Sequence, residues 1–134
     1  MIDLLAAIPL RRSLLADALI TFATGLLLAL GAAPLSGLLG LPRPLLFWAG
    51  ASLLPFAGLV ALLARRAQAP RAGVWAVVLC NALWVVDSVL LLALGWVSPT
   101  ALGSAFVLAQ AAAVAVFALA QYAGLQRRHG AAAA

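Results

Sequence analysis

The sequence predicts an all-α protein, a four-transmembrane-helix bundle with both termini in the cytoplasm. Hydrophobic residues make up 67% of its 134 residues and charged residues only 8%, whereas soluble domains carry about 25% charged residues. Four apolar segments also reach the roughly 20 residues that a helix needs to cross a bilayer: 13–32, 45–64, 73–95 and 101–124. These segments should be helices because lipid offers the backbone no hydrogen-bond partners. We therefore expect one membrane domain over residues 1–128 and a disordered tail over 129–134.

The first expected helix, 13–32, follows the stretch "PLRR" and contains Asp17. Twin arginine before an apolar run is also typical of a cleaved export signal. The acidic residue within the run, together with three later spans that already direct the chain to a membrane, favours a retained helix.

Proline marks the connections to the three later helices. "APLSGLLGLPRP" leads to 45–64, "RRAQAPRA" to 73–95 and "WVSPT" to 101–124. Each connection contains proline, which lacks the N–H that would continue a helix. The stretch "LSGLLGL" (35–41) is apolar but too short to span, so we expect it at the outer interface of the membrane.

Arginine placement predicts the orientation of the bundle. The chain has eight basic residues, all arginine, and seven of them flank the helix ends expected on one side: Arg11, Arg12, Arg65, Arg66, Arg71, Arg127 and Arg128. Only Arg43 lies on the other side. Cytoplasmic loops carry the excess of arginine, so both termini are expected in the cytoplasm. Arginine without lysine, beside abundant alanine, leucine, glycine and proline, is typical of GC-rich coding and indicates a bacterial inner membrane.

Several classes of function are excluded by composition. The net charge is +5, but the arginines form small clusters without interleaved aromatic residues, so we expect no nucleic-acid partner. The single cysteine, Cys80, rules out a C-x-x-C redox motif, and the single histidine, His129, rules out a haem held by paired histidines. No metal-ligand cluster or glycine-rich phosphate loop occurs. The sequence therefore predicts no cofactor, no metal and no catalytic residues.

Polar residues within the apolar spans indicate a candidate site. The loop between the last two helices has its midpoint at Ser98, so Asp87 and Gln110, eleven residues before it and twelve after, lie at nearly the same depth. Thr24 and Ser52 come close to that depth on the other two helices. Lipid satisfies none of these groups, whereas neighbouring helices can. We therefore expect Asp87 to point inward, into a polar layer with Gln110, Thr24 and Ser52.

Two interpretations of Asp87 stay open. An ionised carboxylate near the bilayer centre costs about 2.5–3.5 kcal/mol, so such residues often mark proton or ion paths. Asp17, Thr21 and Asn81 would then extend a relay from the cytoplasmic side. The alternative, which we favour, is a protonated Asp87 that holds the bundle together through Gln110, in a hydrogen bond worth about 0.6–2 kcal/mol.

The second expected hairpin, residues 81–128, reads "NALWVVDSVLLLALGWVSPTALGSAFVLAQ" and continues to "ALAQYAGLQRR". It resembles small four-helix membrane proteins of bacteria. The helix layout is similar to that of DoxX-like four-helix proteins, in architecture only. The resemblance implies the fold, and no motif in it carries a chemistry, because architecture alone does not establish function.

These features predict a non-enzymatic integral membrane protein, either an accessory subunit or a small self-associating bundle. Its expected partners are the lipid bilayer and either a second copy of the chain or a larger membrane protein. Small residues at helical spacing in "AQAAAVAVFALAQ" (109–121) would allow helices to approach closely. The alternative function is a proton-coupled small-molecule transporter or channel that uses Asp87. A water-filled cavity that reaches Asp87 would favour the alternative, and a dry, fully packed core would favour the structural function.

Overall fold

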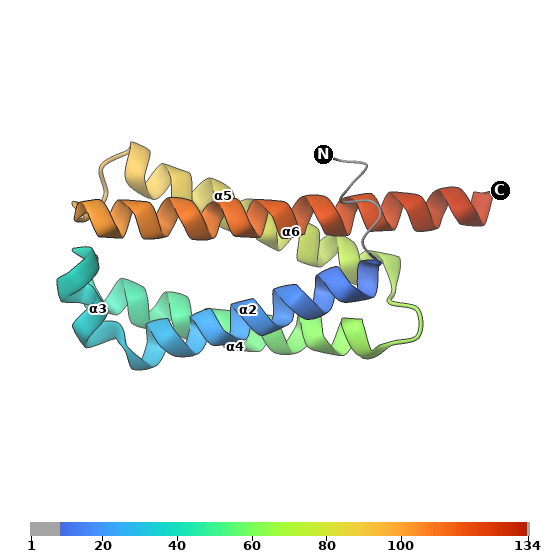
Figure 1. The fold of residues 1–134 in the computed structure, drawn as a ribbon, viewed down its shortest axis with the longest axis horizontal. Coiled ribbons are helices and arrows are strands. Elements are labelled where there is room, and N and C mark those ends of the chain that lie inside the picture. Colours follow the sequence, from blue (N-terminus) through green and yellow to red (C-terminus); the bar gives the residue numbers. More distant parts are fainter. Residues whose placement is uncertain (1–8, 134) are drawn as a thin grey trace.

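The computed structural model describes residues 9–133, and this part of the chain contains five helices and no strand. The helices are α2 (Leu10–Leu30), α3 (Ala32–Leu39), α4 (Arg43–Arg65), α5 (Arg71–Ala93) and α6 (Ala101–Ala133) (Figure 1). Four of them, α2, α4, α5 and α6, are long and apolar enough to cross a membrane. The expected all-α bundle with four potential spans is therefore confirmed.

Prolines set the starts of three helices. Pro9, Pro42 and Pro70 are the N-cap residues of α2, α4 and α5. Proline suits these positions because its φ is fixed near −65° and it has no N–H to leave without a partner. The last helix, α6, is capped differently: the hydroxyl of Thr100 accepts a hydrogen bond from the Gly103 N–H at 3.1 Å.

The last helix is longer than expected. It does not end near residue 124, and it continues through most of the tail 129–134 that we expected to be disordered, as far as Ala133. Alanine has the highest helix propensity of the amino acids, which favours continuation of the helix through this alanine-rich segment. The last residue, Ala134, lies outside the described part of the chain.

The apolar stretch 35–41 forms most of the short helix α3, which closes one end of the bundle (Figure 1). Gly40 ends this helix with a φ of 67°, a left-handed conformation that glycine adopts without a steric penalty. The backbone N–H of Thr100 donates to the Leu39 carbonyl at 3.0 Å. A Cβ at Gly103 would overlap that same carbonyl oxygen. The C-terminus of α3 therefore lies directly against the N-terminus of α6.

The four long helices form two antiparallel pairs. Helix α2 packs along α4, and α5 packs along α6, whereas α4 and α5 touch only slightly (Figure 1). The closest crossing in the first pair is at Gly25 and Gly50: a Cβ at Gly50 would lie 2.6 Å from the Gly25 carbonyl oxygen. We call these pairs the α2–α4 hairpin and the α5–α6 hairpin.

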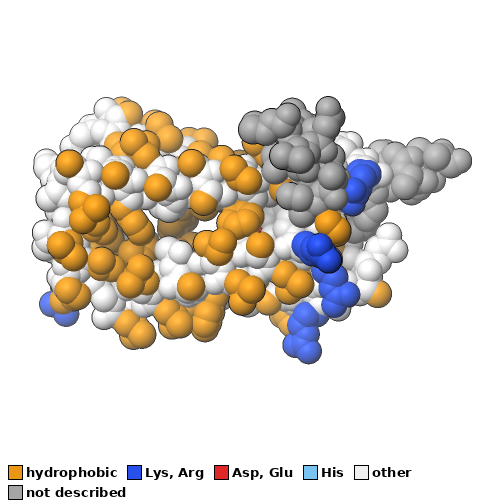
Figure 2. Space-filling view, in the orientation of Figure 1, with side chains coloured by type: hydrophobic (Ala, Val, Ile, Leu, Met, Phe, Trp, Pro, Cys, Tyr) orange, Lys and Arg blue, Asp and Glu red, His pale blue; other side chains and the backbone are white. Residues whose placement is uncertain are grey.

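The exposed arginines lie mostly at one end of the molecule, where α2 and α5 begin and α4 ends (Figure 2). Arg43 lies at the opposite end, beside α3. We call these ends the arginine end and the α3 end. Each has its own packed cluster of buried hydrophobic side chains. The cluster at the arginine end includes Leu14, Val60, Val74, Val77 and Leu125; the cluster at the α3 end includes Leu28, Leu39, Leu41, Leu46 and Val107.

Candidate functional site

A cavity separates the two hairpins between these packed ends. It has two lobes, of about 450 Å³ and about 540 Å³. The first, which we call the Asn81 lobe, is lined by Asn81 and Cys80 from α5, Phe56 from α4, and Ala113 and Phe117 from α6, among others. The second, which we call the Asp87 lobe, lies toward α3 and includes Asp87, Ser88, Trp48 and Trp96 in its lining. Figure 2 shows the surface hollowed between the hairpins.

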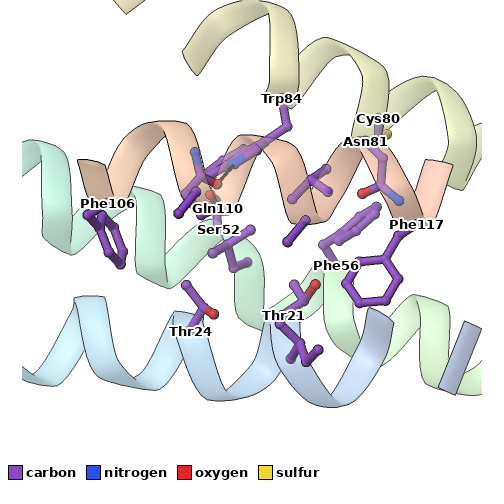
Figure 3. Close-up of a pocket in the computed structure, with 15 residues that line it drawn as sticks. Thr21, Thr24, Ser52, Phe56, Cys80, Asn81, Trp84, Phe106, Gln110 and Phe117 are labelled. Atoms are coloured by element: carbon purple, nitrogen blue, oxygen red, sulfur yellow. Dashed lines mark hydrogen bonds between the residues drawn. The ribbon is translucent and has the colours of Figure 1, made fainter. Parts of the chain in front are cut away.

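The two lobes meet at five residues that line both of them: Thr24, Ser52, Trp84, Phe106 and Gln110. Trp84 Nε1 donates a hydrogen bond to Gln110 Oε1 at 2.7 Å. The Gln110 amide in turn donates to Ser88 Oγ at 3.0 Å and to the Val107 carbonyl at 2.9 Å. These bonds fix the Trp84 ring against α6 at the centre of the cavity, with Thr24 and Ser52 across from it (Figure 3).

A buried polar cluster lies beside the Asn81 lobe, toward the arginine end. Its centre is Asp17 of α2, which is 0% exposed. Thr21 Oγ1 donates to Asp17 Oδ1 at 2.8 Å. Asp17 Oδ2 accepts from Asn81 Nδ2 at 2.9 Å and from Gln121 Nε2 at 2.7 Å. Asn81 Nδ2 also donates to Gln121 Oε1 at 3.1 Å. We call these four residues the Asp17 cluster; it joins α2 of one hairpin to both helices of the other.

The Asp17 cluster is connected to the cavity through Asn81 and Thr21, which belong to both. The Asn81 amide nitrogen is used within the cluster, but its Oδ1 accepts no hydrogen bond from a described residue. Asn81 is buried, at 4% exposed, and its side chain lines the Asn81 lobe. A molecule in the cavity could therefore hydrogen-bond to Asn81 without disturbing the cluster.

The carboxyl group of Asp87 is in a very different environment. The residue is exposed, and it makes no hydrogen bond or ion pair with any described residue. Among the described residues, it is the only acidic or basic one that lines either lobe. Trp48, Trp84 and Trp96 line the same lobe. The Asp87 lobe thus combines one carboxyl group with three tryptophan side chains.

The four residues of the expected polar layer all lie in the wall of the cavity, and the expected bond between Asp87 and Gln110 is not formed. Asp87, Gln110, Thr24 and Ser52 all line the Asp87 lobe. However, Gln110 bonds to Trp84 and Ser88 instead of Asp87, and Ser52 Oγ donates within its own helix, to the Ala49 carbonyl. Asp87 precedes Ser88 by one residue and therefore points about 100° away from it around α5, and no described residue of α6 forms a hydrogen bond with it.

The residues expected in a relay do come together. Asp17, Thr21 and Asn81 form three of the four members of the Asp17 cluster. Gln121, the fourth, was not among the expected site residues. It lies eleven residues, about three helical turns, after Gln110 and therefore on the same face of α6. That spacing is the feature of the sequence from which Gln121 could have been predicted as a site residue.

Searches against protein-family models, curated proteins and solved structures find no match to this chain. The comparisons therefore do not support a relationship to DoxX-like proteins, and the chemistry must be inferred from the cavity itself. Cys80 is exposed and unpaired, and it lines the Asn81 lobe without a hydrogen-bonded base among the described residues. Among the described side chains, no three potential metal ligands lie together. The arrangement is suited to binding a molecule.

Proposed function

We propose that this protein is a non-enzymatic integral membrane protein that binds a small, mainly apolar molecule between its two hairpins. The observation that supports the proposal most strongly is the cavity. Its lobes of about 450 and 540 Å³ fall within the roughly 300–1,000 Å³ of small-molecule sites. A lining of aromatic and aliphatic side chains with a few polar groups is also typical of such sites.

The sequence leaves two functions open, an accessory or self-associating bundle and a small-molecule transporter or channel. The cavity favours the transporter or channel. A fully packed core would have supported an accessory or self-associating bundle, but the cavity extends to Asp87. Binding of a small molecule is the step that a transporter and a simple binding protein share. Proton coupling stays a prediction, supported by the connection of the buried Asp17 cluster to the cavity through Asn81.

The proposed location is the inner membrane of a bacterium, with both termini in the cytoplasm. The support is the concentration of exposed arginines at one end of the four apolar helices (Figure 2), because cytoplasmic loops carry the excess of positive charge. In this orientation the Asp17 cluster lies nearer the cytoplasm and Asp87 nearer the outer face.

Cys80 provides a direct test, because it is the only cysteine in the chain and lines the Asn81 lobe. The probe is triphenylphosphine oxide, a neutral aromatic molecule with one hydrogen-bond acceptor, and the protein is in phosphatidylcholine nanodiscs. We expect the probe to slow the alkylation of Cys80 by N-ethylmaleimide in a saturable way. Ala113→Trp should abolish this protection by filling the lobe that Ala113 lines.

The matched control is Ala112→Trp, one residue away on α6, at an exposed position outside the lining. This variant adds the same side chain to the lipid-facing surface, so protection of Cys80 should persist. Protection that is absent in the unmodified protein, or equal in both tryptophan variants, would show that the cavity does not bind the probe.

A further inference from the structure

We propose that the Asp87 lobe is selective for organic cations, namely molecules with one positive charge on an aromatic or aliphatic body. The inference rests on the proposed function, since it concerns the kind of molecule that the cavity binds. It depends on the carboxyl group and the tryptophan side chains that line this lobe.

Asp87 is the only acidic or basic residue among the described residues that line the lobe. It makes no ion pair with a described residue, and Arg43, the described arginine at the α3 end, lines neither lobe. A carboxylate in a low-dielectric environment without a partner is costly. A cationic molecule would supply the missing charge, whereas an anion would be repelled and a neutral molecule would leave the carboxylate uncompensated.

The tryptophan rings provide the second part of the recognition. The faces of aromatic rings attract cations, and tryptophan does so most strongly. The Trp84 ring is fixed by its 2.7 Å hydrogen bond to Gln110. Trp48 stands against Phe47 in an edge-to-face contact with ring centroids 5.1 Å apart. A ring that is already fixed, such as that of Trp84, loses little entropy when a molecule binds against it. Trp48, which is 68% exposed, and Trp96, which is 65% exposed, lie at the margin of the lobe.

An inorganic cation fits this lobe poorly. Calcium takes six to eight oxygen ligands and magnesium about six, whereas the lobe offers one carboxyl group, with the other oxygens being mainly those of Thr24, Ser52, Ser88 and Gln110. Two of these, Ser88 and Gln110, already bond to each other. A cation that carries its own apolar surface would instead match the predominantly hydrophobic wall.

The test compares tetraphenylphosphonium with tetraphenylborate, which has the same shape and the opposite charge, and with neutral triphenylphosphine oxide. Binding to the protein in phosphatidylcholine nanodiscs is followed by intrinsic tryptophan fluorescence, because three of the four tryptophans line this lobe. We expect tetraphenylphosphonium to bind at least about tenfold more tightly than either other probe. Asp87→Asn should remove this preference by abolishing the tight binding of tetraphenylphosphonium.

Trp48→Leu should also weaken tetraphenylphosphonium binding. The matched control is Trp75→Phe, because Trp75 packs against Tyr122 at 5.7 Å and lines neither lobe. Equal binding of all three probes, or a cation preference that survives Asp87→Asn, would overturn the selectivity but leave the proposed function intact. Failure of every probe to bind would instead overturn the proposed function.

Discussion

Asp17 and Asp87 lie on helices of different hairpins, each about 10 Å from a helix end. Asp17 is fully buried and accepts three hydrogen bonds. Asp87 is exposed and accepts none from the described residues. Asp17 thus makes the kind of interhelical hydrogen bonds that we expected for Asp87, whereas Asp87 makes none with the described residues.

Substitutions of Asp17 should separate its hydrogen bonding from its charge. In Asp17→Asn, the amide oxygen can still accept from Asn81 and Gln121, while the amide nitrogen can donate to Thr21 Oγ1. We expect the thermal stability of this variant in detergent to stay close to that of the unmodified protein. Asp17→Leu removes the acceptor from two buried amides and should cost about 1–3 kcal/mol for each group left without a partner.

Asp87→Leu serves as the control for this pair. It removes a carboxyl group of the same kind, but no described residue loses a hydrogen bond. We expect its unfolding temperature to change little. A larger destabilisation by Asp87→Leu than by Asp17→Leu would contradict the assignment of roles.

At the scale of the elements, the sequence predicts most of what is observed because lipid restricts the choices. The starts and ends of the first three spans agree to within three residues, since apolar length and proline determine them. The depth of Asp87 relative to Gln110 was also predictable from the loop. The rotation of α5 was not, because it depends on which of its faces packs best against α6. The sequence-based pairing of Asp87 with Gln110 was wrong for that reason.

The packing of α2 on α4 can be tested with two glycines of the same helix. At Gly50, a Cβ would meet the Ala29 nitrogen at 2.5 Å and the Gly25 carbonyl oxygen at 2.6 Å; at Gly58, it would meet nothing within 4 Å. Alanine is favoured over glycine in a helix by about 1 kcal/mol. We therefore expect Gly58→Ala to raise the unfolding temperature slightly and Gly50→Ala to lower it. A change of the same sign in both would argue against the close crossing.

At the scale of the whole molecule, the packed clusters lie at the two ends and the cavity lies between them. The sequence does not reveal such a cavity, because it depends on how far the two hairpins stand apart. That separation is set by a few contacts, including the Asp17 cluster and the junction of Gly103 with Leu39. Polar residues on the inner faces of the helices could be predicted, but the space between them could not.

The proposed orientation predicts the side of the membrane on which each end of the bundle lies. Reporter fusions after Arg66 and after Arg128 should report the cytoplasm, and fusions near Arg43 and Ser98 should report the periplasm. The physical reason is the excess of arginine at one end of the helices. A periplasmic signal from the fusion after Arg128 would contradict this orientation.

The residues of the Asp17 cluster lie far apart in the sequence, and this has a consequence for biosynthesis. Asn81 and Gln121 follow Asp17 by 64 and 104 residues. At about 5–20 residues per second, the ribosome needs roughly 5–20 s to supply the last partner after Asp17 is made. During that time the α2–α4 hairpin must hold a carboxyl group that lacks at least one of its two amide donors. Asp17 lies about 10 Å from the start of α2, at the arginine end, so we expect water and lipid headgroups at that end to solvate the group until the second hairpin arrives.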